Sequence, residues 1–173
     1  MSLFAGGCGP KHFVKKDTDT GGLKTVAVLP FENFTGNEHA GEKIRRIVLT
    51  ELLAREVEVV EPGEITRLCR ELKVKSPATI SVKEIQEIGN TLDVSAVMTG
   101  AVETYGMGRG VTVSYPEVTI NLRLIEVSSG DIVWSVRHTS GGPDFWTRHF
   151  GAEGASLSET AGKVVKEAIR TIF

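Results

Sequence analysis

Cysteine and aromatic side chains are scarce in this sequence of 173 residues, which has two cysteines and 6% Phe, Trp and Tyr. Two cysteines cannot form a disulfide framework or a four-cysteine zinc site. The charge is nearly balanced, with 20 Lys and Arg against 22 Asp and Glu, so no polybasic surface is available for nucleic acid. No apolar run approaches the roughly 20 residues of a membrane-spanning helix. What remains is a soluble domain, large enough to fold without cross-links.

The first of the two cysteines lies in a pattern of its own. Small residues at 5–7 directly precede Cys8, and a polar stretch follows from Lys11 to Gly22. This pattern resembles the lipobox of bacterial lipoproteins, in which the cysteine thiol carries a diacylglycerol. Because the charged n-region and most of the apolar h-region are missing, residues 1–8 are expected to be the remnant of a signal peptide. We therefore expect lipid attachment at Cys8. The alternative is a leader with an incidental cysteine.

Residues 9–22 contain several charged and hydroxyl side chains, three glycines and little apolar surface. Such a segment cannot bury enough surface to fold, so we expect a flexible tether. The folded domain would then span residues 23–173. More than one acyl chain holds a protein stably at a bilayer. We therefore expect a protein that is anchored to a membrane without spanning it.

Periodicity of the apolar residues predicts nine elements in the folded part. Strands are expected at 24–31, 56–61, 93–103, 111–127 and 132–138, and helices at 38–54, 64–73, 81–92 and 155–172. Asn37 is the expected N-cap of the first helix, and Ser81 with Glu84 forms a capping box for the third. The order β-α-β-α-α-β-β-β-α predicts a single α/β domain, in which helices pack on a mixed β-sheet.

Two segments resemble a known family. Residues 26–36 read Val-Ala-Val-Leu-Pro-Phe-Glu-Asn-Phe-Thr-Gly, and residues 120–133 read Ile-Asn-Leu-Arg-Leu-Ile-Glu-Val-Ser-Ser-Gly-Asp-Ile-Val. The first resembles the first-strand motif of CsgG-type curli-secretion lipoproteins and of relatives with TolB N-terminal-like domains. The second is similar to a strand–turn–strand unit of the same CsgG-type family. Together with Cys8, this resemblance implies a lipoprotein at the periplasmic face of the outer membrane, often oligomeric, that serves envelope assembly or secretion. The sequence leaves the inner membrane open as an alternative location.

A pore is not expected, because the two places where the pore-forming member inserts membrane hairpins are short in this chain. A membrane hairpin needs two strands of about 9–11 residues each. The first window, 104–114, has eleven residues, and the second, 139–155, has seventeen without alternation. We expect the scaffold of the family without its channel.

No enzyme signature is recognisable, so we expect a non-enzymatic protein without metal or cofactor. Gly106-Met-Gly-Arg-Gly110 has the wrong spacing for a dinucleotide loop and joins two expected strands, which favours a flexible turn. Cys69 lies on the apolar face of its expected helix, where a lone cysteine usually packs as a small hydrophobe. The four histidines lack metal-ligand spacing.

Aromatic residues and arginine gather in one Gly- and Pro-rich connection, at Phe145, Trp146, Arg148 and Phe150. These residue types are enriched at protein interfaces, so they form a candidate partner surface. The alternative is that they cap the core before the last helix. The leading hypothesis is an outer-membrane-anchored lipoprotein that binds envelope proteins or itself. The alternatives are activation of a peptidoglycan synthase or an enzyme with an unfamiliar site.

Overall fold

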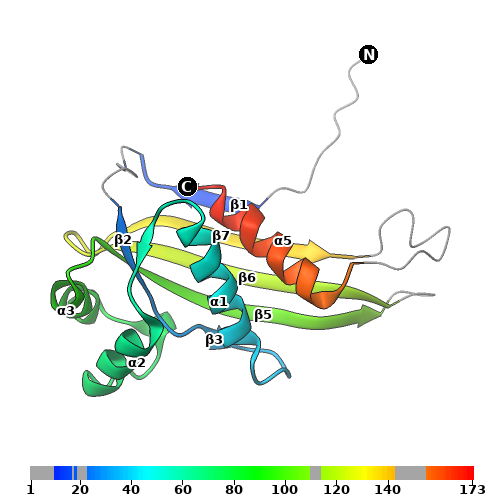
Figure 1. Cartoon of the computed structure of the whole chain (residues 1–173), viewed down its shortest axis with the longest axis horizontal. Helices are drawn as coiled ribbons and strands as arrows, with labels where there is room; N and C mark the ends of the chain where they lie inside the picture. Colours follow the sequence, from blue (N-terminus) through cyan, green and yellow to red (C-terminus); the bar gives the residue numbers. More distant parts are fainter. Residues whose placement is uncertain (1–9, 17, 19–22, 110–113, 143–154) are drawn as a thin grey trace, which may run out of the picture.

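A seven-stranded sheet runs through the computed structural model, which describes residues 10–16, 18, 23–109, 114–142 and 155–173 (Figure 1). Its strands are β1 (Lys11–Val14), β2 (Thr25–Val28), β3 (Glu32–Asn33), β4 (Glu58–Val59), β5 (Ala96–Arg109), β6 (Ser114–Glu126) and β7 (Ile132–Gly141). The helices are α1 (Ala40–Leu53), α2 (Pro62–Glu71), α3 (Val82–Leu92) and α5 (Leu157–Ile169), with a 3-10 turn, η2 (Pro77–Thr79).

The sheet is mixed, as predicted. Its order is β1-β7-β6-β5-β2-β4, and β3 lies beside β5. Strands β1, β7, β6 and β5 pair antiparallel, whereas β2 and β3 pair parallel to β5 and β4 pairs parallel to β2. The parallel strands are joined through helices and the antiparallel ones mainly through short connections, as strand direction requires. The described residues thus form a single α/β domain with four helices packed on one open sheet.

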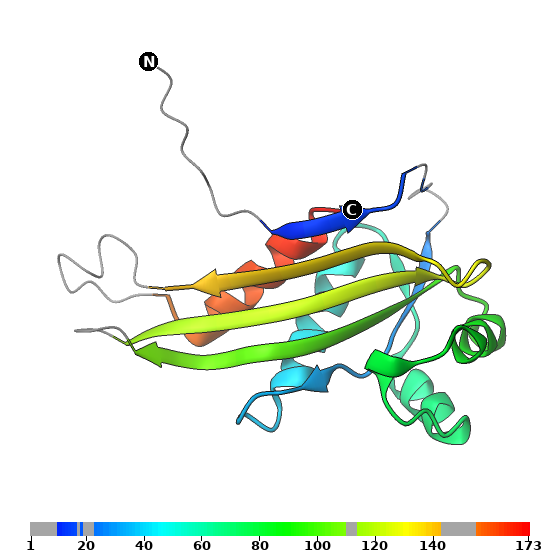
Figure 2. The same cartoon turned by 180° about the vertical axis from the view of Figure 1, so that it is seen from behind.

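Helices α1 and α5 cover one face of the sheet along its length, and α2 and α3 lie on the other side at one end (Figures 1 and 2). The larger core lies under α1 and α5, where β6 contributes its alternate residues: Val118, Ile120, Leu122 and Leu124. This alternation is the one that the sequence predicts for the strand. A second core under α2 and α3 contains Leu29, Ile65, Ile85 and Val97. Over the rest of β5, β6 and β7 no described helix covers this second face.

Local capping explains where the helices begin. The predicted capping box of α3 is present, because Ser81 Oγ accepts from Glu84 N and the Glu84 carboxylate accepts from Ser81 N at 2.8 Å. A second box, Ser156 with Glu159, opens α5. The N-cap of α1 is His39, which makes no side-chain cap, so the prediction of Asn37 was wrong by two residues.

Two segments differ from the sequence prediction. The tether expected at 9–22 contains β1, which pairs with β7 through Lys11↔Arg137 and Val14↔Trp134. The expected glycine turn at 106–110 is also different, because Gly106 and Gly108 lie within β5, which continues to Arg109. Pairing with β6 satisfies the backbone groups on one side of this glycine-containing stretch and extends the strand. In the part of the chain described, no helix is both long and apolar enough to cross a bilayer.

Candidate interaction surfaces

The residues that the sequence singles out for function lie outside the described ranges. This applies to the lipid-attachment candidate Cys8 and to the candidate partner surface at Phe145, Trp146, Arg148 and Phe150. The described surface holds four other features with the character of interaction sites. They are one end of the sheet, two free strand edges and an uncovered polar face.

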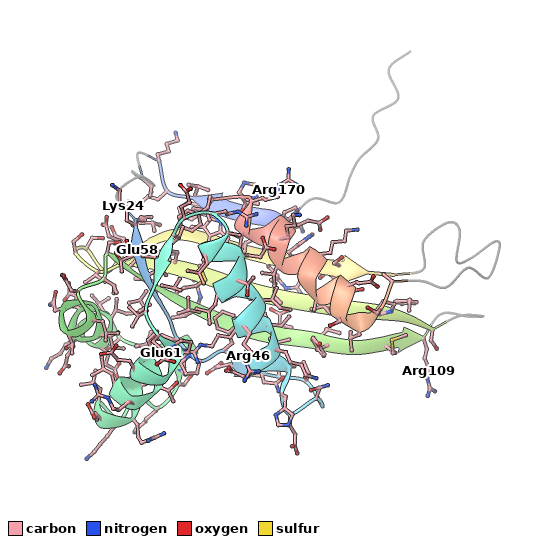
Figure 3. All side chains as sticks on the ribbon, viewed as in Figure 1. Lys24, Arg46, Glu58, Glu61, Arg109 and Arg170 are labelled. Carbon is pink, nitrogen blue, oxygen red and sulfur yellow. The ribbon has the colours of Figure 1, made fainter. Side chains whose placement is uncertain are left out.

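At one end of the sheet, two connections leave the described structure together (Figure 1). The β5–β6 connection runs from Arg109 to Ser114, and the β7–α5 connection follows Gly142. A groove of about 340 Å³ lies beside this end, between Pro116 and Ser140 of the sheet and Glu159 and Lys163 of α5. Arg109 projects from the end of β5 (Figure 3). The connection that contains the predicted aromatic cluster therefore starts at this end.

The outer edge of β5 is free over its second half. Strand β3 accompanies β5 only to Val102, whose carbonyl accepts from Phe34 N at 2.9 Å. No described residue pairs with the outer edge from Thr104 to Arg109. A groove of about 270 Å³ lies along this edge, lined by Thr35, Glu103 to Gly108 and Glu117. Two large apolar side chains are exposed here, Phe34 at 67% and Met107 at 57%.

The second free edge belongs to β1, the last strand on the other side of the sheet (Figure 2). All four of its residues are exposed. Lys15 anchors the end of the strand, because its Nζ lies 2.6 Å from Asp131 Oδ2 and its backbone N donates to Val133 O. That ion pair raises the pKa of Lys15, first through the hydrogen bond to Asp131. Phe13 is 55% exposed and Val14 is 37% exposed.

The face of β5, β6 and β7 away from α1 and α5 is polar. Arg137 on β7 donates from Nε and Nη2 to Glu103 Oε2 at 2.9 and 2.7 Å, across the intervening β6. Thr119 and Thr139 Oγ1 atoms lie 3.0 Å apart on neighbouring strands. Their side chains lie in rows because directly paired residues of an antiparallel sheet share a face. A flat, hydrogen-bonding surface of this kind suits contact with another polar surface better than enclosure of a small molecule.

Two buried polar side chains join helices to the sheet. Arg45 of α1 is 3% exposed and donates from Nε and Nη2 to Val28 O, at 3.1 and 2.8 Å. Burial lowers the pKa of this guanidinium, and the nearby Glu42 carboxylate opposes that shift. His138 of β7 places Nε2 2.7 Å from Glu167 Oε2 of α5. Both contacts satisfy groups that burial would otherwise leave without partners, so they hold the layers together.

Cys69 packs at the edge of the second core, as the sequence predicts. Burial raises the pKa of its thiol, although Arg45 acts in the opposite direction, so the nucleophilic thiolate is disfavoured. Within the described ranges, no three or more His, Cys, Asp or Glu side chains gather as a metal site would require.

Sequence reasoning missed both free edges. The signal for the β5 edge was available, because Tyr105 and Met107 alternate with Gly106 and Gly108 and so continue the strand period. For β1 the signal was only Phe13 and Val14 within a polar stretch. A four-residue strand takes its stability from β7, and no local pattern reveals that partner.

The fold is shared with several solved structures. It is similar to a dodecamer of PelC from Paraburkholderia phytofirmans, with TM-score 0.66, 22% identity and coverage of 94% of this chain and 95% of that chain. It is also similar to lipoprotein GNA1162 from Neisseria meningitidis, with TM-score 0.61, 14% identity and coverage of 85% and 98%. CT253 from Chlamydia trachomatis matches with TM-score 0.53, 12% identity and coverage of 86% and 92%. No family model matches the sequence, and neither does any curated protein.

These similarities overturn the expected membership of the CsgG-type family: the fold resembles PelC and GNA1162 instead. The motifs that suggested the family have a local structural purpose. Asn33 braces the loop after β3, since its Oδ1 accepts from Thr35 N at 3.0 Å and its Nδ2 donates to Asn37 O. Gly130 provides a positive φ of 75° in the β6–β7 turn. These residues are needed by a loop and a turn of the fold. They therefore do not identify one family among the proteins that share this fold.

Proposed function

We propose that this chain is a non-enzymatic bacterial lipoprotein, held at the envelope through Cys8, which assembles with copies of itself and with other envelope proteins. The observation that carries the proposal is the position of β1, which begins three residues after Cys8. The similarity in fold to a lipoprotein and to a dodecameric protein supports both parts of it.

The position of β1 limits how far the domain can lie from its anchor. Three residues span at most roughly 11 Å when extended, compared with roughly 50 Å for the fourteen residues of the expected tether. A lipid on Cys8 would therefore hold the folded domain against the membrane surface. Such close tethering suits a protein that acts at the membrane.

The direction of β1 gives the proposed orientation. Lys11 pairs with Arg137, so the start of β1 points toward the Gly141 end of β7. The β5–β6 and β7–α5 connections leave the sheet at this same end (Figure 1). We therefore orient this end toward the membrane. The aromatic candidates at Phe145, Trp146 and Phe150 belong to one of these connections.

Lipid labelling tests the anchor. The chain is expressed behind a lipoprotein signal sequence, and incorporation of a labelled fatty acid and recovery with membranes are measured. Cys8→Ala is expected to lose the label and to release the protein from membranes, whereas Cys69→Ala keeps both properties. Equal labelling and fractionation of Cys8→Ala and the unchanged chain would refute the anchor. Solution mass of the unlipidated chain over a range of concentrations tests self-assembly.

The alternative that the sequence raises, activation of a peptidoglycan synthase, calls for a long reach from the outer membrane to the cell wall. The short link between Cys8 and β1 provides little of that reach, so we prefer assembly at the membrane surface. Purified synthase distinguishes the two. Binding and acceleration of glycan polymerisation by this chain would favour the activator.

A further inference from the structure

Exposed apolar side chains concentrate at two free strand edges, those of β1 and of the second half of β5. Seven large hydrophobic residues among those described are exposed, and four of them lie at these edges. Phe13 and Val14 belong to β1, whereas Met107 lies on the free half of β5 and Phe34 lies beside it. The two edges are on opposite sides of the sheet (Figure 2). One molecule therefore carries two distinct apolar edges that cannot contact each other.

The β5 edge lacks the devices that usually prevent strand pairing. Proteins protect such edges with lysine, proline or short strands, or cover them with another element. From Thr104 to Gly108 this edge has neither lysine nor proline, and the bulge at Glu103 precedes it. On the uncovered face, a Cβ added at Gly106 would find no atom within 4 Å. This leaves space for a side chain from an added strand.

Strand β1 is compatible with this edge of β5 both in its direction and in the side chains on each of its two faces. When both copies have the same orientation in a continuous sheet, β1 of one copy runs antiparallel to β5 of the other, because β1, β7, β6 and β5 alternate in direction. Phe13 would lie on the uncovered face that contains Gly106. Val14 would lie on the helix-covered face with Met107. We set Val14 opposite Met107, so that two exposed apolar residues meet on the covered face. Antiparallel pairing then places Phe13 opposite Gly108. Its ring lies diagonal to the empty position at Gly106, a separation that aromatic side chains can bridge.

Charge favours the same pairing. Lys11 of β1 and Glu117 of the β5 groove both lie on the uncovered face, as their pairing with Arg137 and Gly141 shows. Neither makes an ion pair with a described residue of its own chain. Opposite charges on two surfaces that meet add to selectivity and association rate without needing a direct ion pair.

We propose that β1 of one copy adds to the outer edge of β5 (Thr104–Arg109) of a second copy, so that the two sheets become continuous. This head-to-tail contact uses two different surfaces, and it forms a closed ring when the rotation between copies is suitable. The inference rests on the proposed self-assembly and names its interface.

Lysine substitutions of the full chain test the interface. Met107→Lys is expected to raise the concentration needed for assembly by at least about tenfold, because it places a charge in the buried centre of the contact. Leu53→Lys on α1 is the matched control, since Leu53 and Met107 are equally exposed at 57%, and it should assemble normally. Assembly of Met107→Lys at the wild-type concentration overturns this interface alone. A wild-type chain that stays monomeric overturns the proposed self-assembly together with the interface.

Disulfide cross-linking tests whether Val14 of one copy and Met107 of the next lie on the same face of the joined sheet. This test does not depend on the lysine variants. In a chain with Cys8→Ser and Cys69→Ala, the pair Val14→Cys and Met107→Cys should link copies under mild oxidation, and Phe13→Cys with Met107→Cys should not. Three strand spacings, roughly 14 Å, separate β1 from β5 within one copy, so a bond between them must join two copies. Equal linking of the two pairs, or linking of neither, overturns the proposed pairing.

Discussion

Trp134 Nε1 donates to Thr171 Oγ1 at 2.8 Å, which joins the first part of β7 to the turn that follows α5. The indole is fully buried in the larger core, and the Thr171 hydroxyl in turn donates a hydrogen bond to Ala168 O at 2.7 Å. Because β7 also carries β1, this contact connects the C-terminal helix to the strand that the proposed anchor precedes. Helix α5 therefore packs against the same strand that holds β1 in the sheet.

Removing this contact should weaken the domain in two separable steps. Thr171→Val keeps the shape but leaves the buried indole N–H without a partner, which should lower the free energy of unfolding by about 1–3 kcal/mol. Trp134→Ala also leaves a cavity and should cost about 3–5 kcal/mol. Urea unfolding followed by circular dichroism measures both changes. A Thr171→Val protein as stable as wild type would show that the hydrogen bond contributes nothing net.

Arg45 should matter far more to stability than its neighbour Arg46. Arg45→Ala leaves Val28 O without its buried donor and removes packing between α1 and β2, with an expected loss of about 2–4 kcal/mol. The Arg46 side chain is 76% exposed and paired only with Glu42, so Arg46→Ala should change stability by less than about 0.5 kcal/mol (Figure 3). Thermal unfolding of the two variants provides the comparison. Similar melting temperatures would contradict the structural role of Arg45.

Much of the fold follows from local patterns in the sequence. The alternation along β6 predicted which side faces the helices, because Leu122 and Leu124 can be buried only together. The box of Ser81 and Glu84 located the start of α3 for an equally local reason. The position of β1 could not be predicted, since its four residues gain stability only from β7, more than a hundred residues away in sequence. The free edge of β5 depends on where β3 stops, which is also a tertiary property.

Alanine at Gly141 should disrupt the β6–β7 pairing, whereas alanine at Gly142 should not. Both have positive φ, 129° and 107°, so alanine is strained at either position. At Gly141 the added Cβ would also lie 2.1 Å from Pro116 O, a backbone atom of the paired strand β6, whereas at Gly142 it would meet nothing within 4 Å. Gly141→Ala should therefore open the end of the β6–β7 pair, and Gly142→Ala should leave the pair closed. Amide hydrogen exchange of Val118 and Ser140 measures the difference. Equal protection in the two variants would contradict the clash.

Acid should weaken the start of α3 through Glu84. The Ser81 hydroxyl and backbone N–H donate to the Glu84 carboxylate and hold its pKa below the ordinary value of 4.5. A folded-state pKa below that of the unfolded chain stabilises the fold fully above about pH 4.5, and the contribution is lost as pH falls through the lower, folded value. Glu84→Gln should therefore be less stable than wild type at pH 7, with the difference shrinking toward acid.

Urea midpoints measured between pH 7 and pH 3 test this prediction for α3. Lys83→Gln is the control, because it changes a neighbouring charge outside the capping box. Its offset from wild type should not shrink in acid as that of Glu84→Gln does. Glu159 has the same arrangement with Ser156 at the start of α5, and its pKa is lowered by the same hydrogen bonds. Glu159→Gln should therefore converge with wild type over the same pH range. If the offsets of both glutamine variants stayed constant down to pH 3, the capping boxes would not be the source of the acid sensitivity.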